Sequence, residues 1–95
     1  MNNNMNYYSI MCLAWEQDED GFVEIISPTG DKVCLNRRLS LIWKFVAEDR
    51  LENKCETKLR EILSEEEIYE GLNYLINNKL IKKYDCAQLF DELFA

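Results

Sequence analysis

Residues 32–46, KVCLNRRLSLIWKFV, decide the fold because the hydrophobic period changes within them. The first four residues, at 32–35, are mostly apolar and follow a turn, which is typical of a short strand. Asn36 is a good N-cap, and apolar side chains then recur at the helical spacing i, i+3, i+4, i+7. The stretch therefore predicts a strand over 32–35 that leads into a helix over about 37–49. The apolar side chains of this helix are Leu39, Ile42, Trp43 and Val46.

Two apolar runs precede this stretch and predict further strands. Residues 7–15 (YYSIMCLAW) and 22–26 (FVEII) are rich in aromatic and β-favouring side chains. Turn residues separate the runs: an acidic segment that ends in Gly21, and then Pro28 and Gly30. Because both connections are short, we expect a three-stranded antiparallel meander with the 32–35 strand at its edge.

Helical signals dominate the second half of the chain. Residues 57–63 predict a short helix whose apolar side chains, including Ile62, face inward. Ser64 opens a third helix, because SEEE at 64–67 is a capping box. Residues 80–84 (LIKKY) predict a short return strand or wing. Together these elements predict an α+β domain of the winged helix-turn-helix kind, with a meander followed by three helices and a C-terminal helical tail.

The chain divides into three parts. Residues 1–6 are expected to be a disordered polar lead-in, 7–84 the folded domain, and 85–95 an amphipathic tail. The first residues do not resemble a secretory signal, so we expect a cytoplasmic protein. Three roles stay open for the tail: packing on the domain, docking a partner enzyme, or forming a homodimer through a helix face. Its apolar residues are Leu89, Phe90, Leu93 and Phe94.

Composition limits the function classes. The 95 residues include 11 Lys+Arg and 18 Asp+Glu, which gives a net charge of −7, and they contain no histidine. This charge argues against nucleic acid or an anionic membrane as the main partner. Because histidine is the commonest general base and zinc ligand, we expect no catalytic activity, no metal and no cofactor. The scattered cysteines, Cys12, Cys34, Cys55 and Cys86, are expected to be reduced thiols.

The predicted edge strand at 32–35 points most directly to a function. Unpaired N–H and C=O groups on an edge strand are a template for a further strand. An extended peptide that adds there gains main-chain hydrogen bonds, and its alternate side chains can enter a pocket under a neighbouring helix. The alternative is an edge that the chain covers itself, for example with the tail from Asp85 onward.

Two segments around this edge resemble a known family. Residues 33–36 (VCLN), which lead into 41–46 (LIWKFV), resemble the L-N-x-x-x-x-x-I-W signature of the PqqD-like proteins. These proteins are the recognition elements of ribosomally synthesised, post-translationally modified peptides. Residues 64–84 are similar to the third helix and the closing L-x-x-x-G-L-I segment of that family, with Lys79 in place of the glycine. The resemblance covers about 33–84 and rests mostly on core positions.

The resemblance implies a non-catalytic peptide chaperone with a winged helix-turn-helix fold. Such a domain binds the leader segment of a precursor peptide as an added strand and presents the peptide to a separate modifying enzyme. That enzyme would be a radical-SAM maturase, a cyclodehydratase or a leader peptidase. Which flank of the third helix faces the peptide stays open, and Leu72 and Ile76 fit a plain core role equally well. The implied binding residues are Lys32, Val33, Cys34 and Leu35 on the strand and Tyr69, Leu72, Asn73 and Ile76 on the helix.

Arg37 and Arg38 are candidates for steering an acidic leader by electrostatic attraction, and plain solvation is the alternative. Two other functions stay open: a winged-helix protein–protein adaptor outside peptide maturation, and an acidic DNA-binding regulator. A helix that reads DNA presents Arg, Lys, Asn or Gln at its N-terminal end. Here the third helix begins with three glutamates, and no Lys or Arg occurs between Arg60 and Lys79, so DNA binding is disfavoured.

Overall fold

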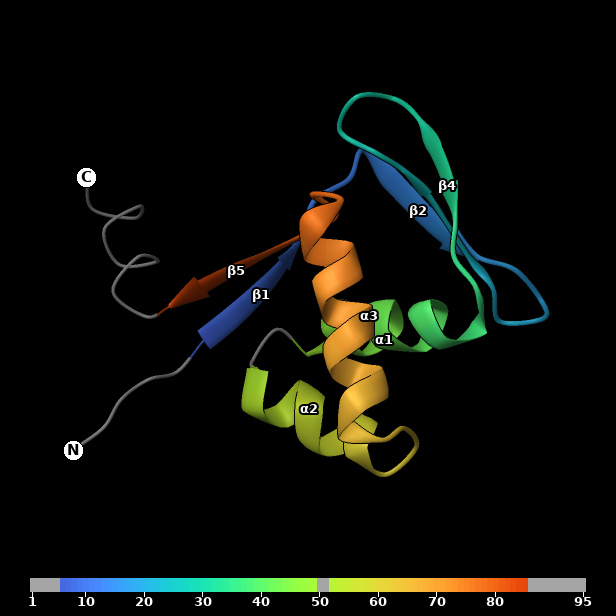
Figure 1. Ribbon diagram of the computed structural model, residues 1–95. Coiled ribbons are helices and arrows are strands. Elements are labelled where there is room, and N and C mark those ends of the chain that lie inside the picture. The colour runs from blue at the N-terminus through green and yellow to red at the C-terminus, as the bar shows by residue number, and fades with distance from the viewer. Residues whose placement is uncertain (1–5, 50–51, 86–95) are drawn as a thin grey trace.

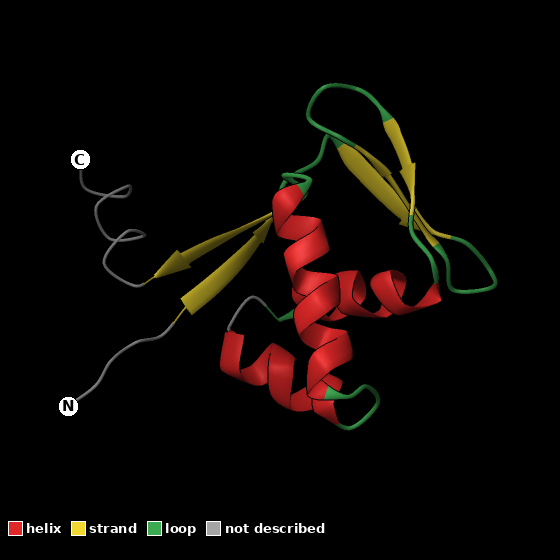
Figure 2. Cartoon of the chain, viewed as in Figure 1, coloured by secondary structure: helices red, strands yellow, loops and turns green. Residues whose placement is uncertain are grey.

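The computed structural model describes residues 6–49 and 52–85, which form an α+β fold of antiparallel strands and three helices (Figures 1 and 2). The predicted α+β class is confirmed at this level. Most of the predicted lead-in and tail lies outside the described residues, whereas Asn6 and Asp85 belong to strands. The strands are β1 (Asn6–Ile10), β2 (Ala14–Gln17), β3 (Val23–Ile26), β4 (Lys32–Cys34) and β5 (Ile81–Asp85). The helices are α1 (Arg37–Glu48), α2 (Glu52–Arg60) and α3 (Glu65–Asn77).

The strands form two separate sheets. β1 pairs with β5, with Tyr8 opposite Lys83. The other sheet is antiparallel in the order β2-β3-β4, so β3 is its central strand. In the view of Figure 1 the β1–β5 ribbon and the β2-β3-β4 sheet extend to opposite sides of α3. The predicted antiparallel order, with the strand after Asp31 at an edge, therefore holds for the larger sheet alone.

The single strand predicted over 7–15 is wrong. The chain leaves β1 after Ile10 and enters β2 at Ala14, in the other sheet. The Met11 N–H donates to the carbonyl of Leu80 at 2.7 Å, whereas the Leu13 N–H donates to the carbonyl of Ile26 at 2.9 Å. The sequence conceals this break because strand-favouring residues continue through it without glycine or proline.

The start of α2 also differs from the prediction. The helix begins at Glu52 and ends at Arg60, rather than spanning 57–63. Cys55 and Leu59 are both 0% exposed, and their i, i+4 spacing gives the helix a buried face that begins before residue 57. Ile62 lies beyond the helix and is 54% exposed, so its predicted inward orientation is wrong.

The two predicted helix caps are present. The Asn36 Oδ1 accepts a hydrogen bond from the Leu39 N–H at 2.8 Å and starts α1. The Ser64 Oγ accepts from the Glu67 N–H at 3.2 Å, and the Glu67 carboxylate accepts from the Ser64 N–H at 3.1 Å. This reciprocal pair is the predicted capping box, and it fixes where α3 begins.

A hydrophobic core joins the helices to both sheets. Its largest member is Trp43 of α1, which is fully buried and meets Trp15 of β2 edge-to-face at a centroid distance of 6.2 Å. The core positions one flank of α3 beside β4. The other buried members include Tyr8, Val23, Ile25, Leu35, Ile42, Val46, Ile68, Leu72, Leu75, Leu80 and Ile81.

Candidate binding groove beside β4

The outer edge of β4 is open to pairing. Among the described residues β4 pairs with β3 alone. The Leu35 N–H donates to the Val23 carbonyl at 2.9 Å, which identifies the residues that bond to β3. Main-chain groups alternate along an antiparallel strand, so Val33 also faces β3, whereas Lys32 and Cys34 direct their N–H and C=O groups outward. These outward groups can pair with an added strand.

Ser40 ties the end of this strand to α1. Its side chain is 1% exposed. Its Oγ accepts a hydrogen bond from the Val23 N–H at 2.9 Å and donates to the Leu35 carbonyl at 3.4 Å. The hydroxyl therefore bridges two main-chain groups that would otherwise pair directly in the ladder. This bridge holds the β4 edge in a fixed position relative to the helices.

A cavity of about 520 Å³ lies beside β4. Val33 of β4, residues of the β3–β4 turn and the C-terminal half of α3 line it. A second cavity, of about 350 Å³, continues past Cys34 to Arg38 at the start of α1. Tyr74 lines both cavities and is 48% exposed. We call these two hollows together the β4–α3 groove.

α3 lies close to α1 beside the groove. A Cβ atom at Gly71 would collide with the side chain of Ile42 and lie 3.5 Å from Leu39 Cδ2. Glycine thus permits this contact, because any side chain at position 71 would require Ile42 to shift. The close contact leaves one flank of α3 facing β4, and that flank carries Glu70, Gly71, Tyr74 and Asn78.

Two ion pairs involve side chains of β4 and of α1, the strand and the helix beside the groove. Arg38 pairs with Glu67 of α3 at 3.2 Å, and Lys32 pairs with Glu24 at 3.5 Å. These side chains are partly exposed, so each pair contributes little to stability and can exchange for a ligand. Arg37 lies away from the groove lining, with its guanidinium 5.3 Å from the centre of the Phe22 ring. The predicted steering role of the two arginines stays a prediction.

The strand residues predicted to bind a peptide occupy different environments. Val33 and Cys34 line the groove, and Cys34 is an exposed thiol. Lys32 is exposed on the same edge, although it lines neither cavity. Leu35 is 4% exposed and belongs to the core. Three of the four thus lie at the open edge, and their contact with a peptide stays a prediction.

The predicted helix residues lie on other flanks of α3. Leu72 is a core residue, and Asn73 and Ile76 are half-buried outside the groove lining. Tyr69 is 70% exposed and lines a separate cavity of about 410 Å³ between α2 and α3. The structure therefore does not bring these four residues together with β4.

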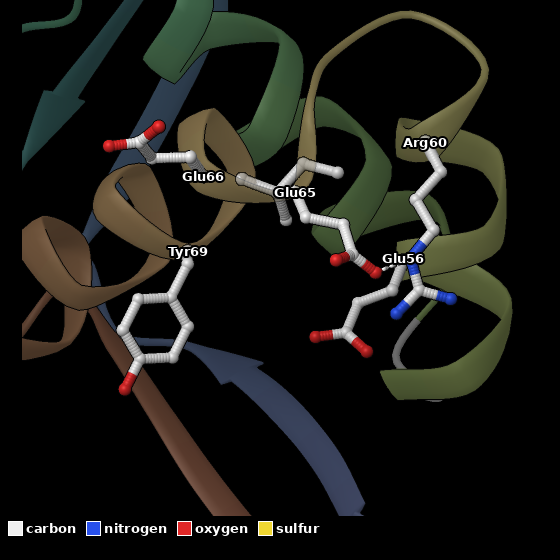
Figure 3. Close-up of a pocket in the computed structure, with 6 residues that line it drawn as sticks. Glu56, Arg60, Glu65, Glu66 and Tyr69 are labelled. Atoms are coloured by element: carbon white, nitrogen blue, oxygen red, sulfur yellow. Dashed lines mark ion pairs between the residues drawn. The ribbon is translucent and has the colours of Figure 1, made fainter.

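Figure 3 shows the cavity that contains Tyr69. The Glu56 carboxylate and the Arg60 guanidinium come from α2, and Glu65 and Glu66 come from the first turn of α3. The Arg60 Nε lies 3.4 Å from Glu65 Oε1, and this ion pair spans the two helices. The pair joins the helix ends, away from β4, so this cavity is a different surface from the groove.

Sequence reasoning missed Glu70, Tyr74 and Asn78. Their spacing of four residues places them on one helix flank. The available signal was Tyr74, a large aromatic residue outside the apolar stripe of the helix. Sequence alone could not show that this flank, rather than that of Tyr69, faces β4, because the choice depends on how α3 rotates against α1.

Among the described residues, Cys12 and Glu67 have shifted pKa values. Burial raises the pKa of the Cys12 thiol, which disfavours the reactive thiolate at neutral pH. Hydrogen bonds from Ser64 lower the pKa of Glu67, and the nearby Arg38 acts in the same direction. Within 6–49 and 52–85, no cluster of three or more His, Cys, Asp or Glu side chains could hold a metal ion.

None of the helices in the described part of the chain is long and apolar enough to cross a membrane. Comparisons of the chain with protein-family models, curated proteins and solved structures give no match.

Proposed function

We propose that the chain is a non-catalytic peptide chaperone that binds the leader segment of a ribosomally made precursor peptide. The leader adds as a strand along the outer edge of β4. The observation that carries this proposal is the β4–α3 groove beside an open strand edge. The resemblance of residues 33–46 and 64–84 to PqqD-like proteins supports the same function from the sequence.

The groove supplies both kinds of contact that strand addition needs. Lys32 and Cys34 each offer one outward N–H and one outward C=O group to the main chain of the leader. Alternate leader side chains then point toward α3, where Tyr74 offers an aromatic surface. Main-chain bonds give affinity without sequence preference, and the cavities on either side of Tyr74 give specificity.

Binding would deliver the peptide rather than change it. A leader held at β4 raises the effective concentration of the attached core peptide at a separate modifying enzyme in the cytoplasm. A radical-SAM maturase, a cyclodehydratase or a leader peptidase fits this role. In this proposal α2 and α3 form the helix-turn-helix of a winged fold, and the acidic first turn of α3 plays no part in DNA binding.

Proline variants test the proposal. Cys34→Pro removes an outward N–H and places a ring on the outer edge, whereas the residues that bond to β3 keep their N–H groups. Gln17→Pro is the matched control, because it makes the same change at the outer edge of β2. The probe is a synthetic leader of a precursor peptide encoded beside the gene for this chain. Calorimetry of wild type and both variants gives the affinities.

We expect Cys34→Pro to weaken leader binding by about tenfold or more, since it removes a main-chain hydrogen bond and adds a clash. Gln17→Pro is expected to bind the leader as the wild type does. Equal affinities for all three folded proteins would refute binding at β4. Circular dichroism confirms that each variant is folded before the comparison.

A further inference from the structure

We propose that the outer edge of β2 is a second docking surface, and that it takes an extended segment of a partner protein in which basic and apolar residues alternate. The inference goes beyond the proposed function and does not depend on it, because β2 and β4 are opposite edges of the sheet. β3 separates the edges, so one molecule can hold a strand on each side.

Main-chain geometry makes β2 a template for strand addition. Within the described residues β2 pairs with β3 alone. The Asp18 N–H donates to the Phe22 carbonyl at 2.9 Å, so the alternation along the strand turns Glu16 toward β3. Trp15 and Gln17 direct their N–H and C=O groups outward. All four residues of β2 are exposed, so a second chain can approach this edge.

Apolar side chains gather at the same edge. Leu13, which directly precedes β2, is 68% exposed, and Trp15 is 36% exposed. A hollow of about 120 Å³ lies next to Trp15, with Ala14 and Ile26 in its lining. Edge strands of monomeric proteins are usually protected by lysine, proline or a bulge. An open edge flanked by exposed apolar residues fits a partner whose alternate side chains are apolar.

Acidic residues determine the charge of the occupant. Glu16 and Glu24 are opposite each other in register and line the hollow beside Trp15. The β2–β3 turn adds Asp18, Glu19 and Asp20. Lys32 pairs with Glu24, but the Glu16 carboxylate forms none of the ion pairs found among the described residues. A segment that lies along β2 therefore meets negative charge on one face and apolar groups on the other.

The same charges disfavour the two occupants that this chain itself could supply. A second copy carries a net charge of −7 and presents the same acidic turn. The segment 86–95 contains Asp91 and Glu92 and no Lys or Arg. Like charges placed opposite each other on paired strands are destabilising. A basic segment of another protein is attracted by the same negative charges that repel a second copy and the segment 86–95.

An amide-resolved NMR titration of the full chain tests the inference. The probe is a short, acetylated and amidated peptide in which lysine and valine alternate, and its matched control has glutamate in place of lysine. We expect the lysine peptide to shift the amides of Leu13, Trp15 and Gln17 and the indole N–H of Trp15. Hydrogen exchange should slow at the outward amides of Trp15 and Gln17 and stay unchanged at Glu16. The glutamate peptide should leave all of these signals in place.

Two variants with the same change of net charge complete the test. Glu16→Lys is expected to weaken binding of the lysine peptide by about threefold to tenfold. Glu66→Lys, at an exposed position on α3, is expected to change the affinity for the lysine peptide by less than about twofold. Equal losses in both variants, or shifts centred on Glu65 and Glu66, would show general charge attraction and overturn the proposal. If the protein is folded and the lysine peptide shifts no amide of β2, the proposal is also overturned.

A dilution series without peptide tests the remaining alternative, which is that a second copy of the chain pairs with β2. Concentration-dependent shifts at Leu13, Trp15 and Gln17 would show that a second copy occupies the edge, which contradicts a basic partner. Leader binding is measured at the amides of Lys32 and Cys34, which lie on the other edge of the sheet. Either proposal can therefore fail while the other holds.

Discussion

Lys79 has a φ of +60°, a backbone conformation that glycine adopts more readily than any residue with a Cβ. It follows the C-cap of α3, where the Lys79 N–H donates to the Ile76 carbonyl at 3.0 Å and the Leu80 N–H donates to the Leu75 carbonyl at 2.9 Å. These two bonds are the Schellman pattern, in which the left-handed position is usually glycine. The lysine also lines the β4–α3 groove.

Replacing this residue with glycine is predicted to stabilise the fold. Lys79→Gly relieves the left-handed strain and should raise the free energy of unfolding by about 1 kcal/mol, which corresponds to roughly 4–8 °C in Tm for a domain of this size. Asn78→Gly is the matched control, since Asn78 has a φ of −88° and donates to the Tyr74 carbonyl. An equal rise in Tm for both variants would contradict the explanation.

Replacing Ser40 is predicted to destabilise the fold. Ser40→Ala removes the hydroxyl between the Val23 N–H and the Leu35 carbonyl and leaves two buried main-chain groups to repair the ladder. We expect a loss of about 1–3 kcal/mol in the free energy of unfolding, measured by urea denaturation. A loss below about 0.5 kcal/mol would mean that the ladder closes directly without the hydroxyl.

At the scale of elements, the cap of α3 makes stability depend on pH. The Ser64 hydrogen bonds lower the pKa of Glu67 below its ordinary value of 4.5 in the folded state. A group with a lowered folded pKa binds its proton less tightly when folded than when unfolded. Its contribution to stability is therefore present above the unfolded pKa and is lost as the pH falls through the folded pKa.

Glu67→Gln tests this contribution, because an amide keeps the hydrogen-bonding shape of the capping box without the charge. We expect the wild type to have the higher Tm at neutral pH and the two Tm values to converge as the pH falls below about 4. A Tm difference that stays constant from neutral to acid pH would show that the charge of Glu67 does not contribute.

The elements also show how far the sequence determines this fold. Asn36 and Ser64 predict the starts of α1 and α3, because a cap acts within one turn of its own helix. The break between β1 and β2 depends on bonds to Leu80 and Ile26, which lie far along the chain. Local propensity contains no information about such partners.

The sequence likewise predicts one side of the candidate site and not the other. The β4 edge was predictable because the short turn before it, with Gly30 at a φ of +91°, pairs β4 with β3. The flank of α3 was not predictable, because its rotation depends on the space that Gly71 leaves for Ile42. Tyr74 therefore replaces Tyr69 as the aromatic residue beside the open edge.

At the scale of the whole molecule, a single central strand organises both proposed surfaces. β3 pairs with β4 on one side and with β2 on the other, which leaves an open edge on each side of the sheet among the described residues. Because β2 and β4 are the two edges, peptides bound at both would run on opposite sides of the same three strands. The chain itself is small and net negative, and in both proposals it holds an extended segment of another chain.

Hydrogen exchange at the β4 edge, with and without saturating leader peptide, tests whether the leader adds as a strand along β4. The leader is predicted to slow exchange at the outward amides of Lys32 and Cys34, while the amides of Val33 and Leu35, which face β3, keep their rates. Unchanged exchange at Lys32 and Cys34 in the presence of bound leader would contradict strand addition at β4.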